Sequence, residues 1–100
     1  MTDMTKLDSQ ISAILDDVIK IRRHIHENPE LGYEEYKTSE LVAKELESYG
    51  IKVERFKDST GVVGLLAGAK PGKTLLLRAD MDALPIQEET GLPFASKVPG

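Results

Sequence analysis

The residue types best suited to chemistry in this chain are Arg78, Asp80 and Asp82, which directly follow the apolar run 75–77. A short run that is apolar on both faces predicts a buried strand. Charged groups at the end of such a strand are costly unless they are paired or put to use. Because the three charged residues alternate along the chain, they are expected on one face of the strand. Ligands of open α/β sheets bind at the carboxyl ends of strands, so this is where we expect chemistry.

Two interpretations of these three residues stay open on the residues alone. In the first, one carboxylate orients a metal-bound histidine or another ligand, and the second carboxylate supports it. In the second, the carboxylates cap the following turn and Arg78 is their ion-pair partner, because ionisable residues at strand ends also form structural networks.

Two histidines and a group of glutamates are the other candidates. His24 and His26 are two residues apart on a predicted helix, so they point in different directions and cannot bind one metal together. We interpret them as positive charge at the end of the helix, or as hydrogen-bonding partners of the connector that follows. An acidic stretch comprises Glu30, Glu34, Glu35 and Glu40. Most of these glutamates are expected to be solvated residues near a helix start.

The first half of the chain predicts two helices. Apolar residues recur at steps of three and four between residues 7 and 25, which is typical of an amphipathic helix. Asn28 and Pro29 end it, because a residue before proline avoids the α region. A second helix is expected over residues 34–49, and Gly50 stands where a left-handed cap belongs.

The second half predicts three strands, over residues 51–56, 62–66 and 74–80, and then a loop over residues 83–100. The last two strands are expected to form a hairpin, because the loop between them is too short for a crossover. The third strand is apolar on both faces and should be covered on both sides. The two predicted helices are the only elements available to cover it. We therefore predict an α/β fold that is the front part of a larger domain.

Composition sets limits on partners and location. The 100 residues are enough for one small domain, and 13 basic against 17 acidic residues give a net charge of −4. No basic patch marks a nucleic-acid or membrane surface, so neither partner is expected. The chain has no cysteine, which excludes disulfides and cysteine metal ligands within it. The polar first ten residues lack the apolar core of a signal peptide, and we expect a cytoplasmic protein.

Two motifs, which agree in order and in spacing, make the chain recognisable. The first comprises Arg22, Arg23, His26, residues 28–35 (NPELGYEE) and Thr38, and the second comprises residues 78–86 (RADMDALPI). Residues 49–51, residues 91–94 and Ser96 fit the same pattern. Together they resemble the opening of bacterial N-acyl-amino-acid amidohydrolases. That family includes hippurate hydrolases, aminoacylases and auxin-conjugate hydrolases, and it is related to zinc carboxypeptidases.

The resemblance implies the N-terminal portion of a three-layer α/β/α catalytic domain of the zinc-exopeptidase type. It also implies a divalent metal, zinc or manganese, which serves the hydrolysis of the amide bond of an N-acyl amino acid. By position, Asp82 matches the aspartate that orients a metal-binding histidine in related exopeptidases. Asp80 falls where those relatives place a metal-ligand histidine and where this branch normally has aspartate, which gives Asp80 a supporting role.

The family's metal ligands and general-base glutamate are expected beyond Gly100, so we assign no metal ligand within residues 1–100. The chain is then an incomplete N-terminal part of the catalytic domain, without the second domain that dimerises or forms a lid. We expect this part to be inactive alone and to bind no metal itself. The parent enzyme is expected to be a homodimer or higher oligomer that acts on a small N-acyl amino acid.

The alternative is a stand-alone small α/β interaction or binding module without catalysis, whose acidic strand end contacts a partner. Residues 75–77 distinguish the two hypotheses. A complete module should cover this apolar run and unfold in one cooperative transition. A fragment should expose the run and tend to self-associate.

Overall fold

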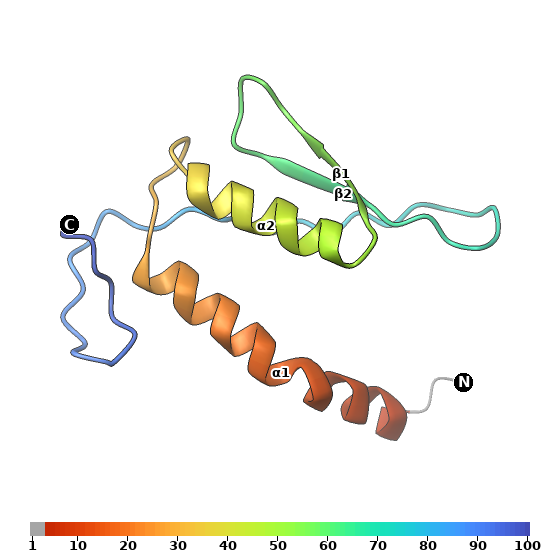
Figure 1. Cartoon of the computed structure of the whole chain (residues 1–100), viewed down its shortest axis with the longest axis horizontal. Coiled ribbons are helices and arrows are strands. Elements are labelled where there is room, and N and C mark those ends of the chain that lie inside the picture. The colour runs from red at the N-terminus through yellow and green to blue at the C-terminus, as the bar shows by residue number, and fades with distance from the viewer. Residues whose placement is uncertain (1–3) are drawn as a thin grey trace. The chain divides into compact units, whose positions relative to one another are not determined.

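The computed structural model describes residues 4–100, and Figure 1 shows their course. The elements in order are α1 (Met4–Glu27), α2 (Tyr36–Ser48), β1 (Lys52–Arg55) and β2 (Val62–Leu65). They fall into two compact units. The first unit contains α1 up to Pro29 together with Ile86–Gly100, and the second unit is Glu30–Pro85.

Helix α1 confirms the first predicted helix and is slightly longer, with 24 residues. It ends where expected, and the Asn28 side-chain nitrogen donates to the carbonyl oxygen of His24 at 2.8 Å. None of its described residues is buried. Its apolar stripe is between 37% and 55% exposed at Leu7, Ile11, Ile14, Leu15 and Val18. The stripe therefore has the pattern of a packing surface without the cover that such a surface usually has.

Helix α2 confirms the second predicted helix, and its end is the predicted glycine cap. Gly50 has a φ of +77°. Its N–H donates to the carbonyl oxygen of Glu47 at 3.0 Å, and the N–H of Ile51 donates to that of Leu46 at 3.1 Å. These two bonds are the pair that defines a Schellman motif, and they turn the chain from α2 into β1.

Strands β1 and β2 form an antiparallel pair in which Lys52 faces Leu65 and Arg55 faces Val62. Helix α2 packs on this hairpin. A Cβ added at Gly64 would lie 3.0 Å from Ile51 Cγ2 and 3.1 Å from Leu46 Cδ1, so the helix and the sheet approach too closely there for a larger residue. The buried side chains of the described residues belong to α2 and are small: Thr38, Ser39 and Ala43.

The α/β class and the two helices are confirmed, whereas the strand arrangement differs from the prediction. The hairpin joins the first two predicted strands instead of the last two. Residues 74–80 form no strand within the described part of the chain, and Leu75, Leu76 and Leu77 are 83%, 84% and 85% exposed. A strand exists only through hydrogen bonds to a neighbour, and within residues 4–100 the sheet consists of β1 and β2, so this run is not part of it. None of the helices described here combines the length and the hydropathy that a membrane span requires.

Candidate functional site

Residues 30–35, which directly precede α2, form a connector that is organised by Glu30. One oxygen of the Glu30 carboxylate accepts from the N–H and from the hydroxyl of Thr38, both at 2.6 Å. The other oxygen accepts from the N–H of Lys37 at 3.0 Å. The residue at the usual cap position, Glu35, makes no capping bond with its side chain. Glu30 therefore caps α2 from five residues further away, supplying acceptors for N–H groups that a helix start leaves free.

These contacts set the charge state of Glu30. Partial burial raises the pKa of its carboxyl, but hydrogen bonds from the Thr38 hydroxyl and from the N–H groups of Thr38 and Lys37 outweigh burial, so the pKa is lowered overall. The carboxylate is thus ionised at neutral pH, where the positive end of the α2 dipole favours it. The sequence predicted that most of the glutamates in this stretch are solvated, and Glu30 is an exception because it is partly buried and bonded to α2. The eight-residue span to Thr38 matches no short capping motif.

Of the two predicted site aspartates, Asp80 lies beside Arg78. The guanidinium Nη2 of Arg78 is 3.0 Å from Asp80 Oδ1, and the two side chains are 81% and 68% exposed. This agrees with the structural interpretation of these two residues. An ion pair that is this exposed contributes little to stability, because water and salt screen it.

Asp82 has different surroundings, since it lies against the connector. The N–H of Ala83, the next residue, donates to the carbonyl oxygen of Glu30 at 2.8 Å. Asp82 Oδ2 is 3.4 Å from the point where a Cβ on Gly32 would lie. The structure thus brings Arg78 together with Asp80 and joins Asp82 to the connector, so the three predicted residues do not form one cluster.

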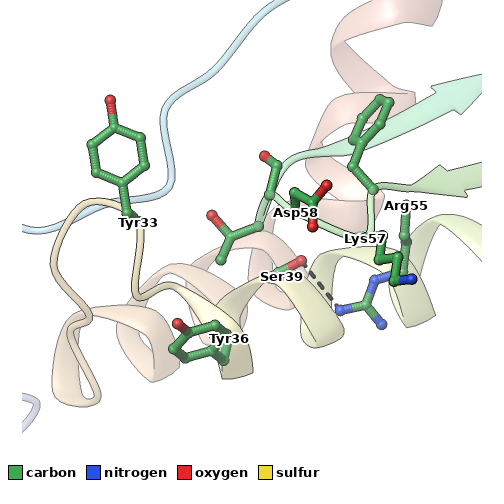
Figure 2. A pocket seen from close by; sticks show the side chains of 9 residues that line it. Tyr33, Tyr36, Ser39, Arg55, Lys57 and Asp58 are labelled. Atoms are coloured by element: carbon green, nitrogen blue, oxygen red, sulfur yellow. Dashed lines mark hydrogen bonds between the residues drawn. The ribbon is translucent and has the colours of Figure 1, made fainter.

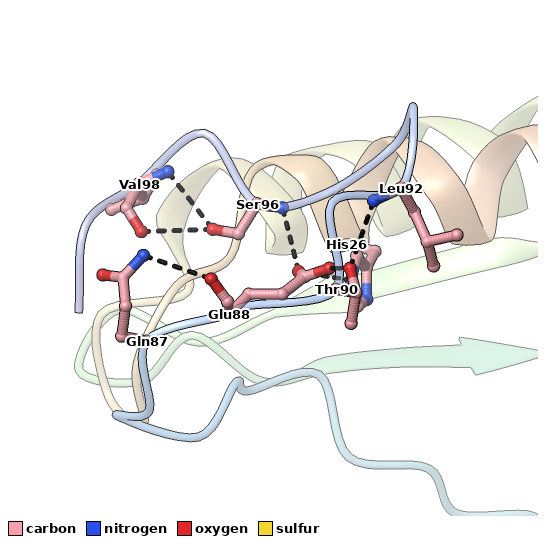
Figure 3. Close-up of polar contacts among 7 residues, drawn as sticks. All are labelled: His26, Gln87, Glu88, Thr90, Leu92, Ser96 and Val98. Atoms are coloured by element: carbon pink, nitrogen blue, oxygen red, sulfur yellow. Dashed lines mark hydrogen bonds and ion pairs between the residues drawn. The ribbon is translucent and has the colours of Figure 1, made fainter.

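One interpretation of the sequence expected His26 to hydrogen-bond to the connector. In the structure its side chain contacts Glu88 instead. Its Nε2 lies 2.7 Å from Glu88 Oε1. Figure 3 shows that the Glu88 carboxylate also accepts from the hydroxyl of Thr90 and, at 2.9 Å, from the N–H of Ser96. The hydrogen bonds from Thr90 and Ser96, and the neighbouring His26, lower the pKa of Glu88. We call these four residues the Glu88 cluster.

Three further contacts attach Ile86–Gly100 to the end of α1. The guanidinium of Arg23 lies 4.4 Å from the centre of the Phe94 ring, a cation–π geometry. The N–H of Lys97 donates to the carbonyl oxygen of Glu27 at 2.8 Å, and the Lys97 ammonium lies 3.2 Å from the Glu27 carboxylate. The sequence predicted a loop over residues 83–100 and did not indicate these contacts. Contacts across more than sixty residues leave no local signal, which is why they were missed.

A pocket of about 450 Å³ lies between the start of α2 and the turn after β1 (Figure 2). Arg55 Nη2 donates to the Oγ of the buried Ser39 at 3.3 Å, and the Thr60 hydroxyl donates to Glu35 at 3.2 Å. The lining residues are Tyr33, Tyr36, Ser39, Arg55, Phe56, Lys57, Asp58, Ser59 and Thr60. Its polar groups can bind a small polar molecule, but the lining contains no histidine and so no serine–histidine pair.

The described residues do not fit a complete metal site. Within residues 4–100, no three histidine, cysteine, aspartate or glutamate side chains are placed to hold one ion. A carboxylate such as Asp82 can act on a metal only through a ligand that another part of a protein supplies.

No family model matches the chain, but individual proteins do. It is 55% identical over 96 residues to thermostable carboxypeptidase 1 of Saccharolobus solfataricus. This match covers 95% of this chain and 24% of the relative. It is 46% identical over 90 residues to the N-acyl-L-amino acid amidohydrolase of Geobacillus stearothermophilus, covering 90% of this chain and 24% of that enzyme. The chain thus spans about a quarter of the length of the curated relatives it matches.

The fold gives the same result. The crystal structure of the Bacillus subtilis YXEP protein, described as a dinuclear metal-binding peptidase of the M20 family, superposes with a TM-score of 0.83. The match has 42% identity and covers 89% of this chain and 25% of that protein. By sequence, the chain is similar to named carboxypeptidases and amidohydrolases, and by fold it matches the N-terminal part of a peptidase of the M20 family.

Proposed function

We propose that this chain is the N-terminal part of the catalytic domain of a metal-dependent enzyme that hydrolyses the amide bond of N-acyl amino acids. The observation that carries the proposal is the similarity to named hydrolases along nearly the whole chain. A carboxypeptidase and an N-acyl-amino-acid amidohydrolase both cleave an amide whose nitrogen belongs to an amino acid with a free carboxylate. That shared bond defines the proposed substrate class.

Asp82 is the residue of this chain to which we assign a part in the reaction. We propose that its carboxylate accepts the ring N–H of a histidine and so orients that histidine toward the metal, zinc or manganese. Its placement supports this assignment, because the carboxylate rests against the connector and is not paired with Arg78. Asp80 keeps a supporting role as the partner of Arg78. The histidine and the other ligands would come from residues outside this chain.

The exposure of residues 75–77 supports the proposal that residues 1–100 are an incomplete part of a domain. A run that is apolar on both faces belongs between neighbouring strands and beneath helices. Here each of its three leucines is more than four-fifths exposed. A stand-alone binding module would be expected to cover them. We also propose that the parent enzyme has a second domain, is cytoplasmic and forms a homodimer or higher oligomer.

The test is a chimera in which this chain replaces the matching segment of the Geobacillus stearothermophilus amidohydrolase. We expect the chimera to hydrolyse N-acetyl amino acids, to lose that activity in a chelator, and to regain it with zinc or manganese. The isolated chain, given the same metals and substrates, should release no amino acid.

A chimera that unfolds in one cooperative transition but shows no hydrolysis would contradict the proposal. Turnover by the isolated chain would contradict it from the other side, because the metal site would then lie within these residues. The unmodified Geobacillus enzyme, purified in the same way, is the control for assay and metal loading.

A further inference from the structure

Glu30 is bound at both its side chain and its main chain. Its carboxylate holds the start of α2 through three hydrogen bonds from Lys37 and Thr38. Because both carboxylate oxygens are engaged by a helix of 13 residues, the Glu30 side chain has little freedom to move relative to α2.

The main chain of Glu30 reaches a segment that lies more than fifty residues later in the sequence. Its carbonyl oxygen accepts the N–H of Ala83 at 2.8 Å. This bond fixes the peptide group that directly follows Asp82. A rotation about the bonds of Glu30 would move the carbonyl oxygen, so the side-chain contacts and the main-chain contact depend on each other.

The carboxylate of Asp82, which is an exposed residue, lies beside the same connector. Its Oδ2 lies at van der Waals distance from the place that a Cβ on Gly32 would occupy. The carboxylate therefore approaches the connector backbone directly. Asp80, two residues earlier, contacts Arg78 in solvent instead.

We propose that Glu30 is the positioning residue for Asp82, which it fixes through the Ala83 peptide while α2 fixes Glu30. The inference rests on the proposed function, in which Asp82 orients a metal-binding histidine. Orientation requires that the carboxylate itself be held in place. The capped helix supplies a rigid support for a group that lies outside any helix or strand.

The first experiment follows amide hydrogen exchange in the chain, resolved at Ala83. We expect Glu30→Ala to speed exchange at Ala83 several-fold, because the variant keeps the carbonyl oxygen that accepts the Ala83 N–H but loses the three side-chain hydrogen bonds that hold this residue in place. Glu30→Gln keeps one acceptor oxygen and the main chain, so it should give an intermediate rate. Glu40→Gln is the matched control, because it removes the same charge from an exposed pair with Lys44 on α2.

The second experiment measures kinetics in the chimera. Glu30→Ala should lower kcat by about tenfold and leave KM unchanged, because a misplaced Asp82 affects the chemical step and not substrate binding. Glu30→Gln should restore part of the loss. A variant that merely weakens the fold would instead reduce the fraction of folded, metal-loaded enzyme. Measuring the metal bound per protein molecule detects that loss separately from a change in kcat.

The outcomes separate this inference from the proposed function. An Ala83 amide that exchanges equally fast in the wild type and in Glu30→Ala, or a normal kcat in Glu30→Ala, would overturn the role of Glu30 alone. A fully active Asp82→Asn chimera would overturn the assignment of Asp82, whatever happens at Ala83. If the Glu30→Ala chain does not fold, the Glu30→Gln comparison at Ala83 decides.

Discussion

Asp80 and Asp82 have the same chemistry, and their neighbours assign them different parts. Asp80 forms a solvent-exposed ion pair with Arg78. Asp82 lies beside Gly32, and the peptide N–H that follows it donates to the carbonyl oxygen of Glu30. In the chimera we expect Asp82→Asn to lower kcat/KM by ~10- to 100-fold, as is usual when a residue that orients a metal ligand is lost. Asp80→Asn, the matched control, should change kcat/KM by less than about threefold because its ion pair is exposed. Equal losses in both variants would refute this distinction.

The contacts around Glu88 should make the local stability of the chain depend on pH in the acid range. The pKa of Glu88 is lowered in the folded state by the Thr90 and Ser96 hydrogen bonds. A lowered pKa means that the stabilisation is present above the unfolded value of ~4.3 and is lost as the pH falls through the folded value. We therefore expect the protection factor of the Ser96 amide, which is the intrinsic exchange rate divided by the observed rate, to fall several-fold as the pH is lowered through the folded pKa of Glu88.

The matched pair Glu88→Gln and Glu89→Gln tests the source of this acid dependence. Glu88→Gln should speed exchange at Ser96 already at neutral pH and abolish the acid step. Glu89→Gln removes a charge from the exposed neighbouring residue and should leave the step in place. Retention of the acid step in Glu88→Gln would assign it to another carboxylate.

Among the elements, the contact between α2 and the β1–β2 hairpin depends on Gly64. A methyl group there would lie about 3 Å from carbons of Ile51 and Leu46. We expect Gly64→Ala to destabilise the chain by ~1–3 kcal/mol, the usual effect of overpacking. Gly72→Ala, where a Cβ meets nothing within 4 Å, should change stability by less than ~0.5 kcal/mol. Urea unfolding followed by circular dichroism compares the two, and equal stabilities would mean that the helix moves away without loss.

The elements that sequence predicted correctly are those with local causes. Helix α1 follows from its apolar period and from Pro29, and the end of α2 follows from Gly50. The third strand failed because a strand requires a neighbour, which its own residues cannot specify. Glu30 and Glu88 were missed as organising residues for the same reason. Their partners lie eight and sixty-two residues away, and no spacing rule covers such pairs.

For the whole molecule, the exposed leucines at residues 75–77 determine solution behaviour. Unpaired apolar segments pair readily with other copies of a chain. We expect sedimentation velocity to show association that grows with protein concentration. Leu76→Lys should weaken it by about tenfold, because burying one leucine contributes ~1.5–3 kcal/mol.

The control for this association is Leu84→Lys, which introduces the same charge at a leucine that is 75% exposed but lies outside the run. It should leave the association largely unchanged. A monomeric wild-type chain across the accessible concentration range would contradict the expectation. The proposal that residues 75–77 belong inside a larger sheet would then lose its support from solution behaviour.

The backbone conformation of Tyr33 bears on why this position holds a tyrosine. Its backbone has a φ of +68°, a left-handed conformation that disfavours a bulky residue by roughly 1–2 kcal/mol relative to glycine. The residue is 92% exposed, so burial within this chain recovers almost none of that energy. Glycine would be the more stable choice at this position if the 100 residues were all that mattered. A tyrosine kept against its own conformational preference indicates a trade-off, in which the side chain serves something other than the stability of the segment that carries it.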